Sequence, residues 1–327
     1  MFYSALNETQ ITDDEYKMAK DAWTAFRCTT MRDYHDAYLL TDTLLLADTF
    51  ENFRTVNVNN NYYSLDPAHF YTTPGLSFQA CLKMTNAKLD LFTDPDMHLF
   101  IENNIRGGVS MISNRYAKAN NAYVGEPDET EPTSFICYLD ANNLYGCAMS
   151  QPLPTSGFKF LSQEEIDDLR VMDVPDNGPT GYILEVDLCY PHELHDLHND
   201  YPLAPEKITV TKHMLSPYAK SFPTEHILSE KLIPNLANKE RYVTHYVNLK
   251  QYIRLGMKLT RVHRVLQFEQ SAWMKPYIDF NTEKRRQATT EFERDLYKLM
   301  NNSVFGETME NLRNRVNIVL CNKEIKA

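Results

Sequence analysis

The stretch FICYLDANNLYG, residues 135–146, decides the fold prediction. Its first half, residues 135–139, is an apolar and β-prone run that predicts a buried strand ending at Asp140. A carboxylate at a strand end, beside a turn, can hold a hard divalent cation while several coordination positions stay open. Tyr145 follows on the next turn. The alternative interpretation is that Asp140 only caps the turn and that Tyr145 lies in the core.

A second stretch, KLMNNSVFG at residues 298–306, closes a helical run. Lys298, Asn302 and Phe305 stand at i, i+4 and i+7, so they share one helix face. A cation, an amide and an aromatic ring on one face are suited to a triphosphate and a base pair, and Gly306 allows backbone to approach a ligand closely. The alternative is an amphipathic helix with a solvated lysine and a core phenylalanine.

Composition indicates a globular protein of mixed charge. The chain has 327 residues, 43% of them hydrophobic, and a net charge of −11. That total argues against a nucleic-acid binder, but the distribution is uneven. Residues 161–200 are strongly acidic, whereas residues 239–264 carry seven bases against the single acid Glu240. A polyanion could bind the second half, although solvated helix faces would produce the same pattern.

The order of expected elements is mixed α and β without regular alternation. Periodicity predicts helices from Asp14 to Phe53, a boundary loop at 57–67 and a short helix near Pro74. Strands are expected after the Gly107-Gly108 turn, at 135–139, over TGYILEVDLCYP and over MKLTRVHRVLQF. A long helix is expected over ANKERYVTHYVNLKQYIRL, ending near Gly256. Two more helical runs are expected, one over residues 277–302 and one over TMENLRNR, residues 308–315.

Taken together, these motifs resemble those of family B DNA polymerases. DANNLYG is similar to their first palm motif, Dxx(S/N)LYP, and KLMNNSVFG to their fingers motif, KxxxNSxYG. IRGGVS, residues 105–110, is similar to the aromatic-x-Gly-Gly element of the protein-primed branch. YLLTD, residues 38–42, matches the third exonuclease motif, YxxxD, set in a helix. The four elements occur in the family's order, and the nearest relatives are polymerases of viruses, linear plasmids and self-synthesising transposons.

The resemblance implies a role for each matching residue. Asp140 would be a palm carboxylate that holds Mg²⁺ or Mn²⁺, and Asp42, aided by Tyr38, a metal ligand of a 3′–5′ exonuclease. Tyr145 would reject a ribose 2′-hydroxyl, and Lys298 would neutralise the triphosphate. The other implied nucleotide-binding residues are Ala141, Asn143, Leu144, Arg286, Asn302 and Phe305, and the implied DNA-binding residues are Arg106, Gly107, Gly108, Ser303 and Gly306.

The implied fold is α+β, an incomplete right-hand polymerase. Residues 1–62 would be the C-terminal part of an RNase H-like exonuclease domain, and residues 63–327 the palm sheet with an insertion and helical fingers. The second palm carboxylate motif is not found, so we expect a fragment with little or no activity alone. Robust Mg²⁺-dependent primer extension by these 327 residues would refute that expectation.

The implied function is template-directed DNA synthesis by nucleotidyl transfer from a dNTP, with two metals stabilising the attacking and leaving oxygens. Expected partners are template and primer DNA, dNTP and a terminal priming protein, which the insertion at about 160–275 would meet. The alternative is a non-catalytic DNA- or protein-binding remnant of a mobile element. No signal peptide or membrane-spanning run is recognised, so an intracellular location is expected.

Overall fold

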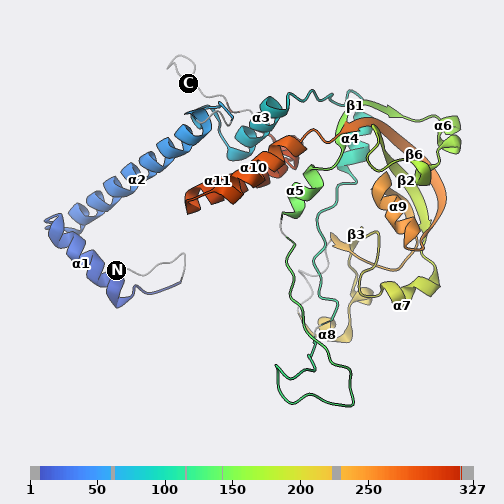
Figure 1. Ribbon diagram of the computed structural model, residues 1–327, viewed down its shortest axis with the longest axis horizontal. Helices are drawn as coiled ribbons and strands as arrows, with labels where there is room; N and C mark the ends of the chain where they lie inside the picture. The colour runs from blue at the N-terminus through green and yellow to red at the C-terminus, as the bar shows by residue number, and fades with distance from the viewer. Residues whose placement is uncertain are drawn as a thin grey trace. The chain divides into compact units, whose positions relative to one another are not determined.

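The computed structural model describes residues 8–59, 63–114, 116–141, 143–222, 230–316 and 318 (Figure 1). The chain divides into two compact units. The first comprises residues 1–84 and 306–327, and the second comprises residues 85–305. The predicted boundary between residues 62 and 63 falls at residues 60–62, which lie outside the described residues, so it stays a prediction.

The first unit is helical, as the periodicity from Asp14 to Phe53 predicts. Helix α1 spans Asp13–Ala25, α2 spans Met31–Asn59, and α3 spans Thr73–Thr85, with 3₁₀ turns at Pro67–His69 and Leu312–Asn314. A capping box begins α1, because Thr12 accepts from the Glu15 amide while Glu15 accepts from the Thr12 amide. The helix expected over TMENLRNR is reduced to the last of these 3₁₀ turns.

The second unit is built on an antiparallel sheet in the order β1-β6-β2-β5 (Figure 1). Its strands are β1 (Leu153–Phe160), β2 (Thr180–Cys189), β5 (Lys239–His245) and β6 (Lys258–Ser271). The strands predicted over TGYILEVDLCYP and MKLTRVHRVLQF are therefore confirmed as the two central strands.

Alternation along the strands gives the sheet a core on each face. Leu184, Val186 and Leu188 of β2 pack with Leu249 of helix α9 (Tyr246–Arg254). On the other face, Val243 and Leu266 pack with Phe100 of helix α4 (Pro95–Glu102). The sheet is thus held between two helices. Gly256 ends α9 with a φ of 102°, which confirms its expected C-terminal position.

The long helix expected over ANKERYVTHYVNLKQYIRL is wrong in its first half. Residues 239–245 form β5, and only Tyr246–Arg254 is helical. Tyr242, Val243 and Thr244 are buried because the strand adds to the edge of β2, and aromatic and β-branched residues fit that half-buried, pleated surface. Pairing with a distant segment has overridden the local helical pattern.

The strands expected at 135–139 and after Gly107-Gly108 are also wrong. Both segments are extended but belong to no sheet in the described part of the chain, where a single bridge joins Asn120 to Ser134. Ile136 and Leu139 are 63% and 85% exposed. A β-prone sequence becomes a strand only where a partner completes its hydrogen bonds, and no described segment pairs with this one.

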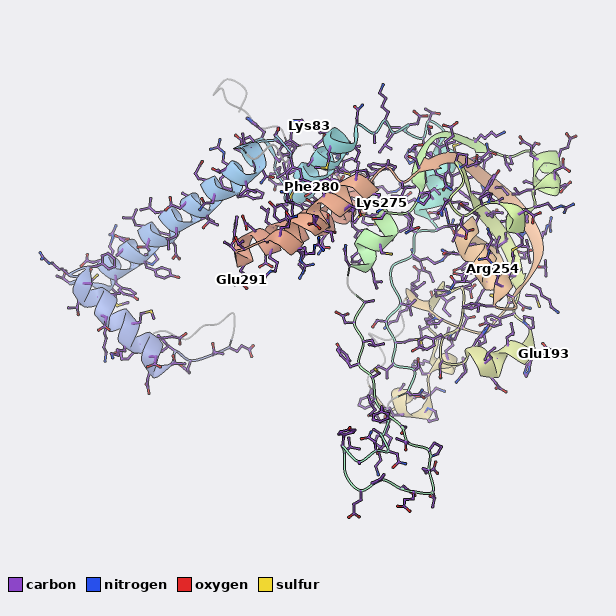
Figure 2. The ribbon with its side chains drawn as sticks, viewed as in Figure 1. Lys83, Glu193, Arg254, Lys275, Phe280 and Glu291 are labelled. Carbon is purple, nitrogen blue, oxygen red and sulfur yellow. The ribbon has the colours of Figure 1, made fainter. Side chains whose placement is uncertain are left out.

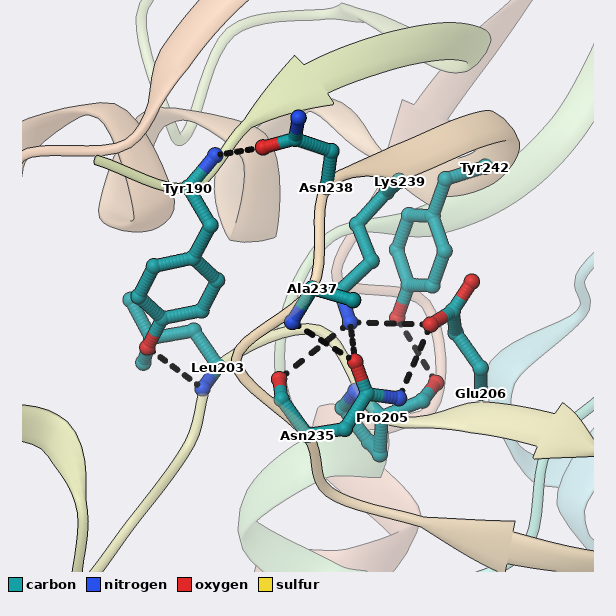
Figure 3. A network of polar contacts seen from close by, with 9 residues as sticks. All are labelled: Tyr190, Leu203, Pro205, Glu206, Asn235, Ala237, Asn238, Lys239 and Tyr242. Atoms are coloured by element: carbon teal, nitrogen blue, oxygen red, sulfur yellow. Dashed lines mark hydrogen bonds and ion pairs between the residues drawn. The ribbon is translucent and has the colours of Figure 1, made fainter. Parts of the chain in front are cut away.

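A two-stranded sheet, β3 (Glu206–Thr209) with β4 (Glu230–Ile233), is tied to the main sheet by a buried lysine (Figure 3). The Lys239 side chain is fully buried, and its Nζ lies 2.9 Å from Glu206 Oε2 and 2.6 Å from Asn235 Oδ1. Burial lowers the pKa of Lys239, which its hydrogen bond to Glu206 partly counteracts. Pairing and hydrogen bonding compensate the cost of burying the charge.

The helical run expected over residues 277–302 is confirmed, but as two helices, α10 (Lys275–Gln287) and α11 (Glu291–Thr308), with a break at residues 288–290 (Figure 2, where Lys275 and Glu291 mark their first residues). Asn281 Nδ2 donates to Asn301 Oδ1 at 2.9 Å, and both side chains are buried. Shorter helical elements are α5 (Leu144–Met149), α6 (Gln163–Asp168), α7 (His195–His198), α8 (Pro217–Lys220) and the 3₁₀ turns Val171–Asp173, His192–Leu194 and Lys212–Met214.

The combination of helices with a curled sheet confirms the mixed α and β class expected from the sequence. Within the described ranges, no helix combines the length and the apolarity needed to cross a membrane.

Candidate functional site

The turn after Asp140 is organised by an asparagine cap. Asn143 begins α5 in the left-handed conformation, with φ 56° and ψ 48°, and its side-chain oxygen accepts from the Gly146 amide at 3.2 Å. A Cβ at position 146 would overlap the Asn143 side chain. Glycine therefore preserves this cap where the resembling motif carries proline, because proline would remove the amide donor and displace the Asn143 side chain.

Tyr145 of α5 stacks on Phe305 of α11. The ring centroids lie 4.3 Å apart, with 26° between the ring planes. Both residues belong to the second unit. Tyr145 stays 55% exposed, so the alternative that places it in the core is wrong. The fold thus brings together two motifs that are far apart in the sequence and leaves an aromatic face open beside their contact.

The α11 face expected from the i, i+4, i+7 spacing is present. Lys298 and Asn302 are exposed, and neither makes a hydrogen bond or ion pair with another described residue. Lys298 stands seven residues before Phe305, about 10 Å along the helix axis. Ser303 is 7% exposed, so its predicted contact with DNA has no accessible hydroxyl in this conformation. Gly306 follows Phe305 without a positive φ.

Asp140 lies in the extended segment before α5 and is exposed, as are Ala141 and Leu144. The carboxylate makes no hydrogen bond or ion pair with a described residue, so the alternative role as a turn cap is taken by Asn143 instead. The chain from Asp140 to Tyr145 spans at most about 18 Å between Cα atoms. This limit keeps the acid in the neighbourhood of the ring stack.

No cluster of three His, Cys, Asp or Glu that could hold a metal ion occurs among the residues with described positions. A lone, open carboxylate nonetheless suits Mg²⁺, which proteins bind through one or two carboxylates together with waters and substrate phosphates. The unpaired Asp140 side chain is therefore compatible with the expected cation.

The two other basic residues that the resemblance implies, Arg286 and Arg106, lie elsewhere in the second unit. Arg286, near the end of α10, is largely exposed and pairs with Glu283 at 2.8 Å. The Arg106 guanidinium stacks over the Tyr242 ring at 3.9 Å. Gly107 and Gly108 have neither a positive φ nor any atom within 4 Å of an added Cβ. Nothing in the described fold requires glycine at these two positions, and their contact with DNA stays a prediction.

Tyr38 and Asp42 occupy neighbouring turns of α2, as the YxxxD spacing predicts. A hydrogen bond to Asp42 raises the pKa of Tyr38 above its ordinary value. Tyr38 is 59% exposed. The pair is thus linked on one helix face, and its exonuclease role stays a prediction.

Sequence reasoning missed the side chains of β5, which it placed in a helix. Arg241 lies in this strand and interacts with Glu185 and Asp187 of β2. The signal that could have located the strand is the run Tyr242-Val243-Thr244, whose residue types favour sheets.

Comparison with solved structures finds Phi29 DNA polymerase. An orthorhombic crystal form matches with a TM-score of 0.49 and 13% identity, covering 90% of this chain and 47% of that chain. A complex with primer-template DNA and incoming nucleotide substrates gives 0.42 and 14%, covering 91% and 41%. A post-translocation complex with primer-template DNA gives 0.45 and 15%, covering 88% and 45%. This chain therefore spans less than half of each matched chain.

No curated protein matches the chain. A family model does: the one described as DNA polymerase type B, organellar and viral, matches residues 5–327. The match covers nearly the whole sequence and includes the motifs at residues 38–42, 105–110, 140–146 and 298–306. This confirms the family B assignment made from those motifs. The chain therefore belongs to the type B DNA polymerases of organelles and viruses.

Proposed function

We propose that the chain contributes the nucleotide-binding part of a longer DNA polymerase, which adds dNTPs to a primer on a DNA template. The observation that carries this proposal is the stacking of Tyr145 on Phe305, at 4.3 Å between ring centroids. That contact joins the turn after Asp140 to the α11 face carrying Lys298. The Asp140 carboxylate, the Tyr145 ring and the Lys298 ammonium would then surround one binding site, with the groups that a nucleoside triphosphate needs.

We assign a separate role to each residue of this site. The open face of Tyr145 packs against the deoxyribose and leaves no room for a 2′-hydroxyl. The Lys298 ammonium attracts the triphosphate, and it makes no ion pair with a described carboxylate that would have to be broken first. Asn302 and Phe305 lie on the same helix face and border the nascent base pair. Arg286 would have to leave Glu283 to reach a phosphate.

Asp140 and the Ala141 carbonyl would hold Mg²⁺ or Mn²⁺. When bound, the ion stabilises negative charge on the attacking and leaving oxygens of an in-line displacement. The Asp140 carboxylate needs no rearrangement of an internal pair to accept it, because no described residue bonds to it.

The wider assignments follow from family membership. Residues 63–327 would be palm, insertion and fingers in a right-hand arrangement, and Tyr38 with Asp42 would belong to a 3′–5′ exonuclease. Arg106, Gly107 and Gly108 would contact template or primer backbone. One of the Phi29 structures is a complex with primer-template DNA and incoming nucleotide. The same partners are proposed here, together with a terminal protein as primer.

Nucleotide binding by the 327-residue chain tests the proposal. A fluorescent dATP is titrated in Mg²⁺ against the wild type, Lys298→Ala and Tyr145→Ala. Lys298→Ala should weaken binding about tenfold, in line with the removal of one charge-assisted hydrogen bond. Tyr145→Ala should reduce the preference for dATP over ATP, because the barrier to the 2′-hydroxyl is gone.

Lys275→Ala is the matched control, because Lys275 is an exposed lysine of the neighbouring helix paired with Asp279. It should bind dATP as the wild type does. Equal losses for Lys275→Ala and Lys298→Ala would assign the effect to net charge and contradict the site. A wild type that binds no nucleotide would support the alternative, a non-catalytic DNA- or protein-binding remnant.

A further inference from the structure

One face of the main sheet carries three arginines around a buried acid. Glu185, at the centre of β2, has an 8% exposed side chain. Its carboxylate accepts from Arg264 Nε of β6 at 2.9 Å and lies 3.5 Å from Arg241 Nη1 of β5. The Arg264 guanidinium also stacks 4.8 Å from the Phe100 ring centroid. The acid beneath and the ring beside them hold two guanidinium groups in place while both remain partly exposed.

A β-bulge adds the third arginine to this face. Glu185 pairs with Arg264 and Val186 with Val262, so His263 is an extra residue in β6. The bulge reverses the alternation of β6, and Arg261 comes opposite Asp187 on the same face as Arg264. A regular strand would have turned Arg261 toward the α9 side of the sheet.

Arg261 is exposed and makes no hydrogen bond or ion pair with another described residue. The pKa of the Asp187 carboxyl is lowered first by a hydrogen bond from the Arg241 amide and then by His263. The Arg261 charge adds only a longer-range contribution to this lowering. The Arg261 guanidinium donors are therefore open to a ligand.

Arg241 is held in an unfavourable backbone conformation. Its φ is 49°, in the left-handed region, although it is a large residue within β5. Glycine usually occupies such bulge positions, and a residue with a Cβ is strained there. The Arg241 side chain is nevertheless 69% exposed. A strained position that places an exposed cation indicates a use for the side chain other than packing.

The three arginines line a hollow of about 700 Å³, bordered by Gln163, Ile166 and Asp167 of α6. Arg241 also lines a neighbouring hollow of about 190 Å³ that contains Arg106. Arg106 is the residue before Gly107-Gly108, the stretch proposed to contact DNA. The basic side chains thus extend from that stretch across the sheet by way of Arg241.

We propose that Arg241, Arg261 and Arg264 form a second binding surface for nucleic acid, which takes the phosphates of a strand continuing from Arg106. Guanidinium groups match phosphate geometry through paired hydrogen bonds, and Arg241 and Arg264 are oriented in advance by Glu185. The inference rests on the proposed function for the choice of nucleic acid as partner. Asp167 on the rim restricts the phosphates to the sheet side of the hollow.

Binding of a labelled single-stranded oligonucleotide to the 327-residue chain, by fluorescence anisotropy across a salt series, tests the proposal. Arg261→Gln and Arg241→Gly should each weaken binding about threefold to tenfold. The slope of log K against log salt should fall by about 0.7 for each phosphate of the single strand that the variant no longer neutralises. Arg254→Gln on α9 removes the same charge from the other side of the sheet (Figure 2) and should bind as the wild type does.

Arg241→Gly carries a second readout, its thermal stability. Because glycine relieves the positive φ, the variant should melt no lower than the wild type although it binds nucleic acid less well. A lower melting temperature with unchanged binding would show a purely structural arginine and overturn the proposal.

Two further results would overturn it: equal losses for Arg254→Gln and Arg261→Gln, or competition by poly-glutamate as strong as that by oligonucleotide, which would assign the surface to an acidic protein. If Arg261→Gln and Arg241→Gly bind the oligonucleotide as the wild type does, while Lys298→Ala still weakens nucleotide binding, this surface alone is refuted. Absence of dATP binding in the wild type refutes the proposed function instead.

Discussion

The four-stranded sheet and the segment leading to α5 have similar residue types but opposite environments. Leu184 in β2 is 1% exposed, and Val186 is fully buried. Tyr138 and Leu139, in the equally apolar run before Asp140, are 94% and 85% exposed. The sheet has partners for its strands and a helix on each face. The segment before Asp140 has neither among the described residues.

This difference shows which part of the candidate site the fold supports. Tyr145 and Phe305 sit on helices that contact each other. Asp140, in contrast, follows a segment whose apolar side chains are exposed to solvent. A strand that pairs with residues 135–139, or a bound nucleotide and metal, would supply the contacts that this segment lacks among the described residues.

The largest effect is expected from truncating a leucine in each region. Leu184→Ala should lower the free energy of unfolding of the second unit by about 3 kcal/mol, because it leaves a cavity in the sheet core. Leu139→Ala should change it by less than about 0.5 kcal/mol. Hydrogen exchange of peptides from β2 and β6 measures the change in the free energy of unfolding for each variant. Comparable losses would mean that residues 135–139 are packed in solution, and the contrast would be wrong.

An intermediate effect is expected from acid. Burial lowers the pKa of His245 from 6.5 to about 4. Between these values the unfolded chain binds a proton that the folded sheet does not, so stability falls as the pH drops from 6.5 toward 4. The loss from this group should reach about 2 kcal/mol at about pH 5. Exchange of β5 and β6 peptides against pH should show it, with little change in residues 135–141.

His245→Asn is the control for the acid effect. His245 Nδ1 accepts from the Val247 amide at 3.4 Å at the start of α9, and asparagine can keep such a cap. The variant should lose most of the pH dependence between 6.5 and 4. A slope as steep as in the wild type would assign the acid sensitivity to other groups. Asp176 is not one of them, because its hydrogen bond to Lys250 lowers its pKa from 3.8, so its contribution is lost mainly below that value.

The smallest effect is expected where the two regions meet. A double-mutant cycle of Tyr145→Leu and Phe305→Leu should give a coupling energy of about 1 kcal/mol, as expected for stacked rings. It is read from exchange of peptides that contain residues 144–149. The pair Tyr145→Leu and Phe292→Leu should give none, since Phe292 lies in the first turn of α11 and is 41% exposed. A coupling near zero for the first pair would separate the two motifs and remove the main support for the nucleotide site.

The candidate site could be predicted in part because its motifs are local. Spacing alone put Lys298, Asn302 and Phe305 on one face, since seven residues make nearly two helical turns. It likewise put Tyr38 one turn from Asp42. The meeting of Tyr145 with Phe305 was only implied by resemblance, because no local pattern encodes a contact between distant segments.

Periodicity and residue types were sufficient to predict the helices of the first unit, strands β2 and β6 and the helical run that contains α10 and α11. The resemblance of its motifs was sufficient to predict the family. Only the tertiary structure decided that residues 239–245 form a strand and that residues 135–139 do not. Both runs are β-prone, and pairing distinguishes them: β5 finds the edge of β2, whereas the run before Asp140 finds no described partner. The arginine surface has the same origin, because the bulge at His263 exists only through the register between β6 and β2.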